Sequence, residues 1–145
     1  RVVQEVCDGA QLSARTRQIS LGLSVGAGTR VRGEKFLLAQ AVSNLVQNAL
    51  EFTPSGGRVT VTVEARDGMA FVIVMDTGLG VPTYALERIF DRFYSLPRPA
   101  TGRKSSGLGL SIVREIVRLH GGEVMIENRP EGGARAVLRM PLAKA

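Results

Sequence analysis

The sequence has few of the residues on which several common kinds of functional site depend. It contains one cysteine, one histidine and no tryptophan in 145 residues. A lone cysteine cannot form an internal disulfide or a cysteine-rich zinc site, and it is typical of a protein from a reducing compartment. The lone histidine, His120, is followed by two glycines, a context that indicates the end of a helix rather than a catalytic triad. No apolar run is long enough to span a bilayer.

Aromatic residues are also scarce, whereas positive charge and glycine are in surplus. Five Phe and two Tyr accompany 19 Lys+Arg, 13 Asp+Glu and 17 Gly. The net charge of +6 indicates an anionic partner, which could be nucleic acid, an acidic membrane or a phosphate compound. Nucleic-acid binding is a weak hypothesis, because the basic residues are scattered without interleaved aromatics. The glycines suggest loops that approach a ligand closely.

The hydrophobic pattern predicts one domain over residues 1–145, an α/β (α+β) two-layer sandwich. Apolar spacing of three and four predicts helices, and alternation predicts strands. The expected order is a helix near the N-terminus, a strand at 18–25, a helix at 34–52, a hairpin at 58–65 and 69–75, a short helix at 82–93, a mobile loop at 95–107, a helix at 110–120 and strands at 123–127 and 134–140. Such an order favours a mixed, largely antiparallel sheet with helices on one face. Because the chain starts at Arg1 without a methionine, we expect a fragment of a longer protein.

One face of the helix at 34–52 is polar. Gln40, Asn44, Asn48 and Glu51 are four, four and three residues apart, so they share a face opposite the apolar stripe. An ordinary solvated face is the alternative, but asparagine is a poor helix former. A carboxamide oxygen is a suitable ligand for Mg²⁺, which proteins usually hold together with phosphates and water.

An acidic residue ends the strand at 69–75 and is followed by glycines. Asp76 can accept a hydrogen bond from an exocyclic amino group, while Gly78 and Gly80 let the backbone approach a flat ring. A strand that simply ends in a glycine turn is the alternative. AspThrGly is also the tripeptide of aspartic proteases, in which two carboxylates form a dyad, but that hypothesis leaves the asparagine face unexplained.

A second glycine pair, SerSerGlyLeuGlyLeu at 105–110, leads into the last helix. Backbone N–H groups at a helix N-terminus, unobstructed by Cβ atoms, can bind phosphate. A flexible connector with a serine cap is the alternative. The chain has no Walker A motif, and neither GlyLeuGly has the third glycine of a dinucleotide fingerprint.

Four motifs together carry a family resemblance. NLVQNALEFTP (44–54), DTGLGV (76–81), RIFDRFYSLP (88–97) and SSGLGLSIV (105–113) resemble, in order and spacing, the N, G1, F and G2 boxes of bacterial sensor histidine kinases. The resemblance covers nearly the whole chain and implies the ATP-binding catalytic domain of the GHKL superfamily, with a Bergerat fold that binds ATP and Mg²⁺.

The resemblance implies a role for each matching residue. Asn48 would coordinate Mg²⁺, Asn44 would lie beside the phosphates, and Asp76 would bind the adenine amino group in a pocket shaped by the two glycines. Phe90 and Phe93 would anchor the lid over the nucleotide, and Phe90 and Tyr94 would contact the nucleotide. The second glycine box would line the triphosphate with Gly107, Leu108, Gly109 and Leu110.

Some positions depart from the family pattern. Glu51 and Ser95 stand where many members have basic residues, so the cation near the γ-phosphate would have to be a nearby substitute. The candidates, which the sequence alone does not rank, are Arg92, Arg98, Arg103 and Lys104. The last strand lacks a threonine that is common in the family.

The resemblance also implies a reaction and partners. Hydrolytic relatives such as gyrase carry a glutamate at the position of Asn44 to activate water, and an amide cannot act as that base. We therefore expect a kinase that donates the γ-phosphate to a histidine on a separate dimerisation domain, from which a response regulator receives it; a degenerate interaction module is the alternative. The parent protein is expected to be a homodimer in the bacterial inner membrane, and this piece a monomeric cytoplasmic domain that binds no nucleic acid.

Overall fold

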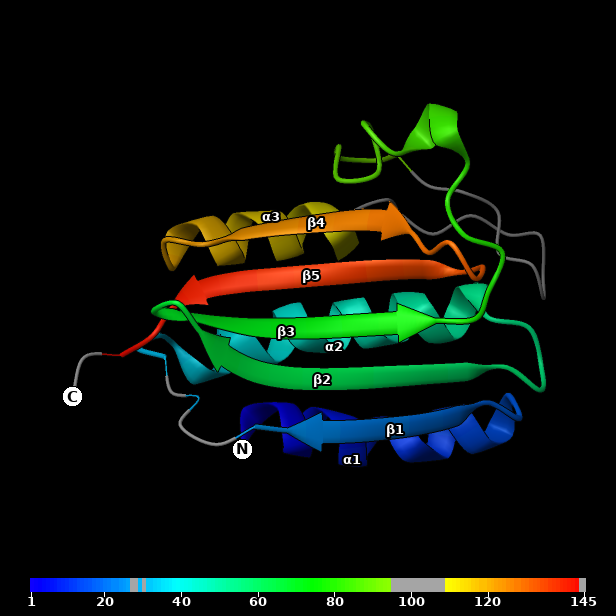
Figure 1. The fold of residues 1–145 in the computed structure, drawn as a ribbon, viewed down its shortest axis with the longest axis horizontal. Coiled ribbons are helices and arrows are strands. Elements are labelled where there is room, and N and C mark those ends of the chain that lie inside the picture. The colour runs from blue at the N-terminus through cyan, green and yellow to red at the C-terminus, as the bar shows by residue number, and fades with distance from the viewer. Residues whose placement is uncertain (27–28, 30, 95–108, 144–145) are drawn as a thin grey trace.

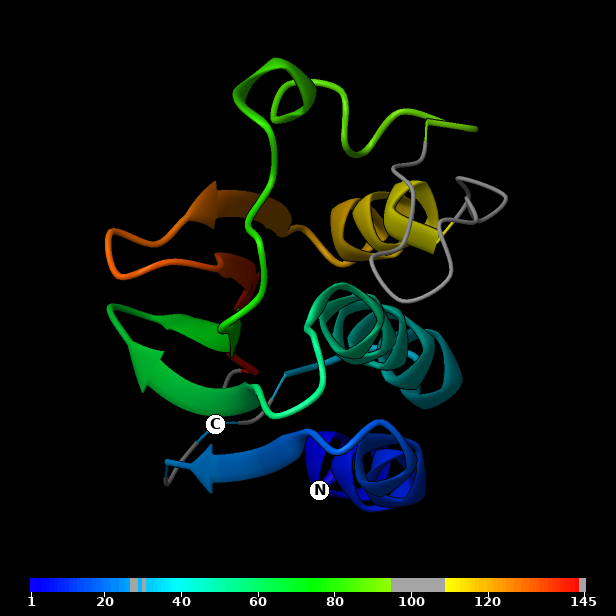
Figure 2. The same ribbon diagram turned by 90° about the vertical axis from the view of Figure 1, so that its right-hand side faces the viewer.

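The residues that the structure describes fold into two layers, a five-stranded sheet and three helices that cover one of its faces (Figures 1 and 2). The computed structural model describes residues 1–26, 29, 31–94 and 109–143. Its elements are α1 (Val2–Thr16), β1 (Ser20–Val25), α2 (Lys35–Phe52), β2 (Arg58–Arg66), β3 (Met69–Asp76), the 3₁₀-helix η1 (Thr83–Ala85), α3 (Gly109–Leu119), β4 (Glu123–Asn128) and β5 (Ala134–Pro141). The predicted two-layer α/β sandwich is confirmed.

The sheet has the strand order β1-β2-β3-β5-β4. Only the β1–β2 pair is parallel, and the other three pairs are antiparallel. This agrees with the mixed, largely antiparallel sheet that the sequence predicts. The two hairpins, β2–β3 and β4–β5, meet where β3 pairs with β5, so residues far apart in sequence lie side by side at the centre of the sheet.

The alternation of side chains places Asp76 on the helix-covered face. Val74 is paired with Val61 on one side and Ala136 on the other, and all three are buried. Side chains two residues apart in a strand share a face, so Asp76, two residues beyond Val74, points toward the helices at the end of β3. Ala134, two residues before Ala136 on β5, donates its N–H to the Asp76 side chain.

Helix α2 is the central helix of its layer and lies between α1 and α3 (Figure 2). Its apolar side chains fill the core, and Leu45 and Leu50 are almost completely buried. Each leucine buried in this way contributes on the order of 1.5–3 kcal/mol. Glu34 caps the helix by accepting the Leu37 N–H at 3.1 Å. None of the helices in the described ranges has both the length and the hydrophobicity needed to cross a membrane.

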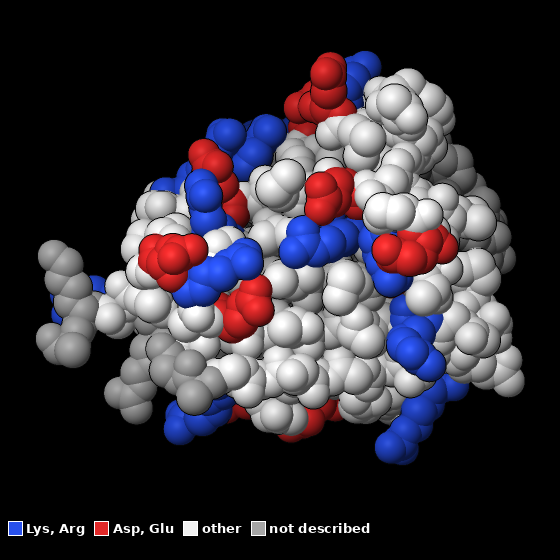
Figure 3. All heavy atoms as spheres, viewed as in Figure 1, with Lys and Arg blue, Asp and Glu red and all other residues white. Residues whose placement is uncertain are grey.

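The open face of the sheet carries charges of both signs (Figure 3). Across β4 and β5, Arg135 pairs with Glu127 at 2.9 Å and Arg139 pairs with Glu123 at 3.2 Å. The two signs therefore alternate on this face, which does not present a patch of positive charge alone.

The short helix predicted for residues 82–93 is wrong. Only Thr83–Ala85 form a 3₁₀-helix, and the chain continues in turns with i to i+3 bonds, such as Arg88 N–H to the Ala85 carbonyl at 2.9 Å. The expected apolar face is not buried as a unit, because Ile89 is 8% exposed and Phe93 is 73% exposed. A helix this short depends on packing of a continuous apolar stripe, which the segment lacks. The loop predicted at 95–107 falls outside the described residues.

Candidate functional site

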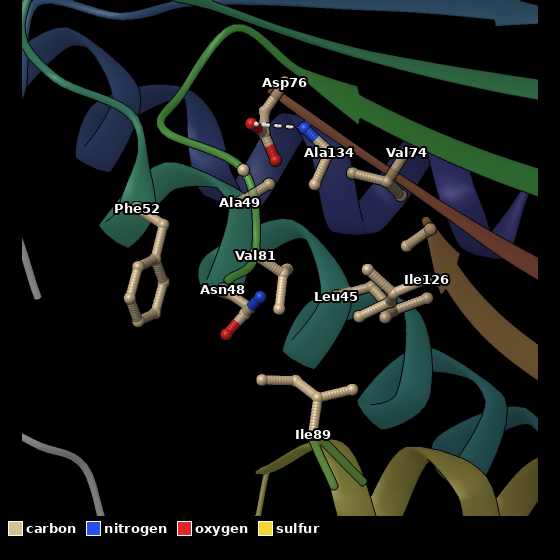
Figure 4. Close-up of a pocket in the computed structure, with 12 residues that line it drawn as sticks. Leu45, Asn48, Ala49, Phe52, Val74, Asp76, Val81, Ile89, Ile126 and Ala134 are labelled. Carbon is tan, nitrogen blue, oxygen red and sulfur yellow. Dashed lines mark hydrogen bonds between the residues drawn. The ribbon is translucent and has the colours of Figure 1, made fainter. Parts of the chain in front are cut away.

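A pocket lies between α2, the end of β3 and the β4–β5 hairpin (Figure 4). Its walls are mostly apolar, and two polar side chains, Asn48 and Asp76, line it from α2 and β3. Small-molecule sites commonly combine an apolar cleft with a few fixed polar groups. The lining residues are Leu45, Asn48, Ala49, Phe52, Val74, Asp76, Gly80, Val81, Ile89, Ile126, Ala134 and Ala136.

Asp76 is held in a fixed orientation by backbone N–H groups. Its Oδ1 atom accepts hydrogen bonds from Gly78 at 2.9 Å and from Ala134 at 3.2 Å. The carboxyl group is directed toward the pocket (Figure 4). Burial raises the pKa of this carboxyl, and the two N–H bonds and the charge of Arg129 oppose that rise. The result is a preorganised acceptor that would prefer a hydrogen-bond donor on a ligand.

Gly78 and Gly80 are required by the close approach of the chain at this point. A Cβ atom on Gly78 would collide with the carbonyl oxygen of Phe52 at the end of α2. Gly80 has φ +77°, and its Cβ would lie 2.8 Å from Oδ1 of Asn128. Side chains are rare in that backbone region. The glycines therefore let the segment after β3 pass between α2 and the β4–β5 hairpin, where it forms one edge of the pocket.

The two asparagines of α2 differ in what they contact. Asn48 lines the pocket. Asn44, one turn earlier, donates from Nδ2 to the carbonyl of Gly109 at 3.2 Å, where α3 begins. Both side chains are half-buried rather than fully solvated. The structure thus brings the start of α3 next to the polar face of α2, with Leu110 partly buried against the core. Lys104, Gly107 and Leu108 lie outside the described residues.

The predicted lid residues up to 94 contact α3 and each other. Arg92 forms an ion pair with Glu115 of α3 at 2.9 Å. The guanidinium of Arg114 lies 6.0 Å from the centre of the Phe90 ring, and that of Arg88 lies 5.1 Å from the Tyr94 ring. None of Phe90, Arg92 or Tyr94 lines the pocket, whereas their neighbour Ile89 does.

Two residues at the site, Asn128 and Arg129, were not predicted from the sequence. The carboxamide of Asn128 bonds the backbone of Val81 twice, each at 2.7 Å, and Arg129 donates from Nη1 to the Asp76 carbonyl at 2.9 Å. Alternation along β4 is the signal that could have predicted Asn128, since it lies two residues beyond Ile126, which lines the pocket. Only the strand pairing brings Arg129 to Asp76.

The donor set in and around the pocket is suited to a metal that is shared with a ligand. No group of three or more His, Cys, Asp or Glu side chains in the described part of the chain could hold a metal ion by itself. Asn48 offers a carboxamide oxygen at the pocket, one turn of α2 after Asn44, which contacts the start of α3. Mg²⁺ typically takes one or two protein oxygens and completes its shell with phosphate and water, so these residues fit an ion that arrives with a nucleotide.

Comparison with known proteins agrees with this geometry. The family model for histidine kinase-, DNA gyrase B- and HSP90-like ATPases matches residues 33–144. The sensor protein CreC of Escherichia coli (strain K12) is 53% identical over 110 residues, which are 76% of this chain but only 23% of CreC. The chain therefore spans about a quarter of this curated relative.

Solved structures show the same fold. The nucleotide-free catalytic domain of histidine kinase ThkA superimposes with a TM-score of 0.86 at 30% identity, covering 99% of this chain and 93% of that domain. ThkA in complex with the response regulator TrrA gives 0.81 at 28% identity, covering 98% and 40%. Full-length ShkA in complex with AMPPNP gives 0.84 at 29% identity, covering 99% and 30%. The chain belongs to the family of histidine kinase-, DNA gyrase B- and HSP90-like ATPases, and its fold is that of a histidine kinase catalytic domain.

Proposed function

We propose that this chain binds Mg-ATP in the pocket between α2 and the β4–β5 hairpin and donates the γ-phosphate to a histidine on a separate helical dimerisation domain. One observation carries the proposal: the fixed carboxyl of Asp76 lines the pocket together with Asn48, and the turn of α2 before Asn48 contacts the start of α3. The Asp76 acceptor is suited to the amino group of a nucleobase, and the apolar walls are suited to its ring. The N-terminus of α3 is suited to phosphates.

The adenine would lie at the Asp76 end of the pocket. The carboxyl is already aligned by two N–H groups, so it can accept a bond from the exocyclic amino group with little reorganisation. Val74, Ala136 and Ile126 provide apolar surface beside it. Gly78 and Gly80 let the backbone lie close beside this end, because a Cβ at either position would collide with Phe52 or Asn128.

The phosphates would lie toward Asn48, Asn44 and the start of α3. The N–H groups at the start of α3, an 11-residue helix, favour negative charge. Asn48 would hold Mg²⁺, which when bound neutralises charge on the phosphates. We also assign phosphate contacts to Gly107, Leu108, Gly109 and Leu110, and the cationic role near the γ-phosphate to Arg92 and Lys104.

Transfer to a histidine, rather than hydrolysis, follows from the chemistry of Asn44. A carboxamide cannot take a proton from water at neutral pH, so this position supplies no general base. Phosphoryl transfer depends mainly on positioning and charge neutralisation, which the pocket can provide. The acceptor must come from another domain, because the ring nitrogens of His120 are both engaged in the structure, with Glu34 and Ile116.

The partners would be those of a two-component system. We propose that the phosphoacceptor and dimerisation domain belongs to the same parent protein and that a response regulator receives the phosphate from it. The structure of ThkA with TrrA supports this for a relative of the same fold. We further propose that the parent is a homodimer in the bacterial inner membrane and that this domain is monomeric in the cytoplasm.

Calorimetric titration with a non-hydrolysable ATP analogue, with and without Mg²⁺, tests the binding step. We expect Mg²⁺-dependent binding that is weakened by Asn48→Asp and by Asp76→Asn, while Gln47→Glu, next to Asn48 but absent from the pocket lining, leaves affinity unchanged. Unaltered affinity in both pocket variants would show that the pocket is wrongly assigned.

Transfer is tested by adding the helical histidine domain of a related kinase with labelled ATP. The expected product is phosphohistidine on that domain. ATP binding without any phosphohistidine would instead favour a regulatory interaction module that has lost catalysis.

A further inference from the structure

Asn128, the last residue of β4, binds both backbone groups of a single residue in another segment. Its Oδ1 accepts the N–H of Val81 and its Nδ2 donates to the Val81 carbonyl, each at 2.7 Å. The orientation of the carboxamide is set by these partners, since a backbone N–H can only donate and a carbonyl can only accept. Asn128 thus pairs with Val81 as a neighbouring strand would.

Val81 is the point at which the chain leaves the body of the domain. It follows Gly80, whose φ is +77°, and precedes Pro82, which has no N–H to bond. Beyond it the chain forms only the short helix η1 and turns up to Tyr94. Val81 also lines the pocket. The hydrogen bonds to Asn128 therefore fix the place where the lid segment begins and where the pocket edge ends.

Arg129 holds the other end of the same segment. It donates from Nη1 to the Asp76 carbonyl at 2.9 Å, its Nη2 lies 3.1 Å from Glu131, and its side chain is 22% exposed. Two consecutive residues of the β4–β5 hairpin therefore hold the 76–81 segment at both of its ends. The hairpin therefore holds residues 76–81, which include Gly78 and Gly80, in a fixed position without a ligand.

We infer that Asn128 is a positioning residue for nucleotide binding: through its two bonds to Val81 it fixes the edge of the base pocket and the point where the segment 82–94 begins. The inference rests on the proposed function, since it assumes that the pocket takes a nucleotide. Asn128 would touch no part of the ligand and would act only through the position of Val81. Without Asn128, the pocket edge at Val81 would have to become ordered when the ligand binds. The entropy cost of that ordering lowers the affinity.

Two substitutions at Asn128 test its pair of bonds to Val81. Asn128→Ala removes both bonds. Asn128→Asp replaces the donor by a second carboxylate oxygen, which at neutral pH repels the Val81 carbonyl, so the side chain is expected to move away and the bond from the Val81 N–H to be lost as well. Once protonated, the new carboxyl regains a donor, so its behaviour should approach that of the wild type as the pH falls from 7.5 toward 4. Glu127→Gln is the matched control, because it alters the adjacent residue and breaks only the Arg135 ion pair.

The experiment measures hydrogen-exchange protection of the Val81 amide by NMR in the nucleotide-free domain, and the affinity for a non-hydrolysable Mg-ATP analogue by calorimetry. Both Asn128 variants are expected to lose Val81 protection and to bind the analogue about 10-fold more weakly at pH 7.5. Asn128→Asp should recover Val81 protection at low pH, and Glu127→Gln should behave as wild type. Amide protection in β2 and β3 reports whether each variant remains folded.

The outcomes distinguish the two proposals. If the wild type binds no nucleotide, the proposed function fails. If the wild type binds and the folded Asn128 variants bind within twofold of it, or keep Val81 protection, the role of Asn128 is overturned while the proposed function stands. Recovery of protection by Asn128→Asp at low pH supports the hydrogen-bonding role, and absence of recovery overturns it, because a steric effect would not follow the protonation of a carboxyl.

Discussion

The Nε2 atom of His120 accepts a hydrogen bond from the backbone N–H of Glu34 at 3.1 Å, across 86 residues of sequence. The other ring nitrogen, Nδ1, lies 2.7 Å from the carbonyl of Ile116, which can only accept. His120 therefore carries its proton on Nδ1 and joins the end of α3 to the N-cap of α2. Together with the bond from Asn44 to Gly109 at 3.2 Å, it fastens both ends of α3 to α2, one at the N-cap of α2 and the other at its middle.

Replacing His120 by Phe should destabilise the domain. A phenyl ring retains an aromatic side chain but leaves the Ile116 carbonyl and the Glu34 N–H without this partner, which is expected to cost about 1–3 kcal/mol. Urea unfolding followed by circular dichroism measures the change. Leu119→Ala is the control, because Leu119 is adjacent in sequence and 77% exposed, and it should change the stability little. A phenylalanine variant as stable as wild type would show that the ring nitrogens are not needed.

Gly133→Ala should be far more damaging than Gly132→Ala. Gly133 has φ +85° and Gly132 has φ +108°, so alanine is strained at either position. Only at Gly133 does an added Cβ collide with the carbonyl oxygen of Asp76, whereas at Gly132 nothing lies within 4 Å. We expect Gly132→Ala to cost about 1 kcal/mol and Gly133→Ala several kcal/mol with loss of nucleotide affinity. Equal free energies of unfolding for the two variants would mean that the loop relaxes freely.

The elements with one regular buried face could be predicted from the sequence. The period of hydrophobicity predicts α2 and the strands because each buries one regular face; Val59, Val61 and Val63, for example, alternate and are all buried. Asp76 could also be predicted as a pocket residue, because it follows the alternate positions Val72 and Val74 at the end of β3. It also precedes two glycines. Local pattern and burial are sufficient for such elements.

Other parts depend on pairing between distant segments, which a local pattern does not contain. Asn128 and Arg129 belong to the site only because β4 and β5 bring them beside the loop after β3. The predicted helix at 82–93 is absent because Phe93 and its neighbours do not pack as one stripe; Phe93 itself has φ +65° and is exposed. The polar face of α2 was visible in sequence, but the contact of Asn44 with Gly109 was not.

Asp76→Asn should become more stable relative to the wild type as the pH rises. The same substitution should weaken nucleotide binding. Burial raises the pKa of Asp76 in the folded state, so the folded domain binds this proton more tightly than the unfolded chain does. The stabilisation from that proton is present below the ordinary Asp pKa of about 4 and is lost as the pH rises through the folded value. Each unit by which the pKa is raised corresponds to about 1.4 kcal/mol.

Urea unfolding of wild type and Asp76→Asn at pH 4.5, 6 and 7.5 measures this difference. The amide can still accept the bonds from Gly78 and Ala134, so the variant should gain stability relative to wild type from the lowest to the highest pH. A difference that stays constant or changes in the opposite direction would show that the carboxylate is not disfavoured by burial. Calorimetry at pH 7.5 should show weaker binding of the ATP analogue by the more stable variant.

Arg92, which forms an ion pair with Glu115, should affect catalysis rather than stability. The two side chains are 66% and 57% exposed, and an exposed pair typically contributes between 0 and 1 kcal/mol. If Arg92 supplies charge to the γ-phosphate, Arg92→Gln should lower the rate of phosphohistidine formation. Glu115→Gln should leave that rate unchanged or raise it, because it releases the guanidinium. Equal losses in both variants would indicate that the pair itself, and not the cation, is required.

Cys7 should be almost unreactive until the domain opens. It is 1% exposed on the buried side of α1, and burial, followed by the nearby charge of Asp8, raises its pKa. Because the thiolate is the reactive form, alkylation by iodoacetamide at pH 8 should be slow in buffer and fast in denaturing urea. Leu12→Cys in a Cys7→Ser background provides the matched control, since Leu12 lies on the same helix and is 75% exposed; it should react at the rate of a free thiol in both conditions. Rapid alkylation of native Cys7 would mean that α1 separates readily from α2 and the sheet.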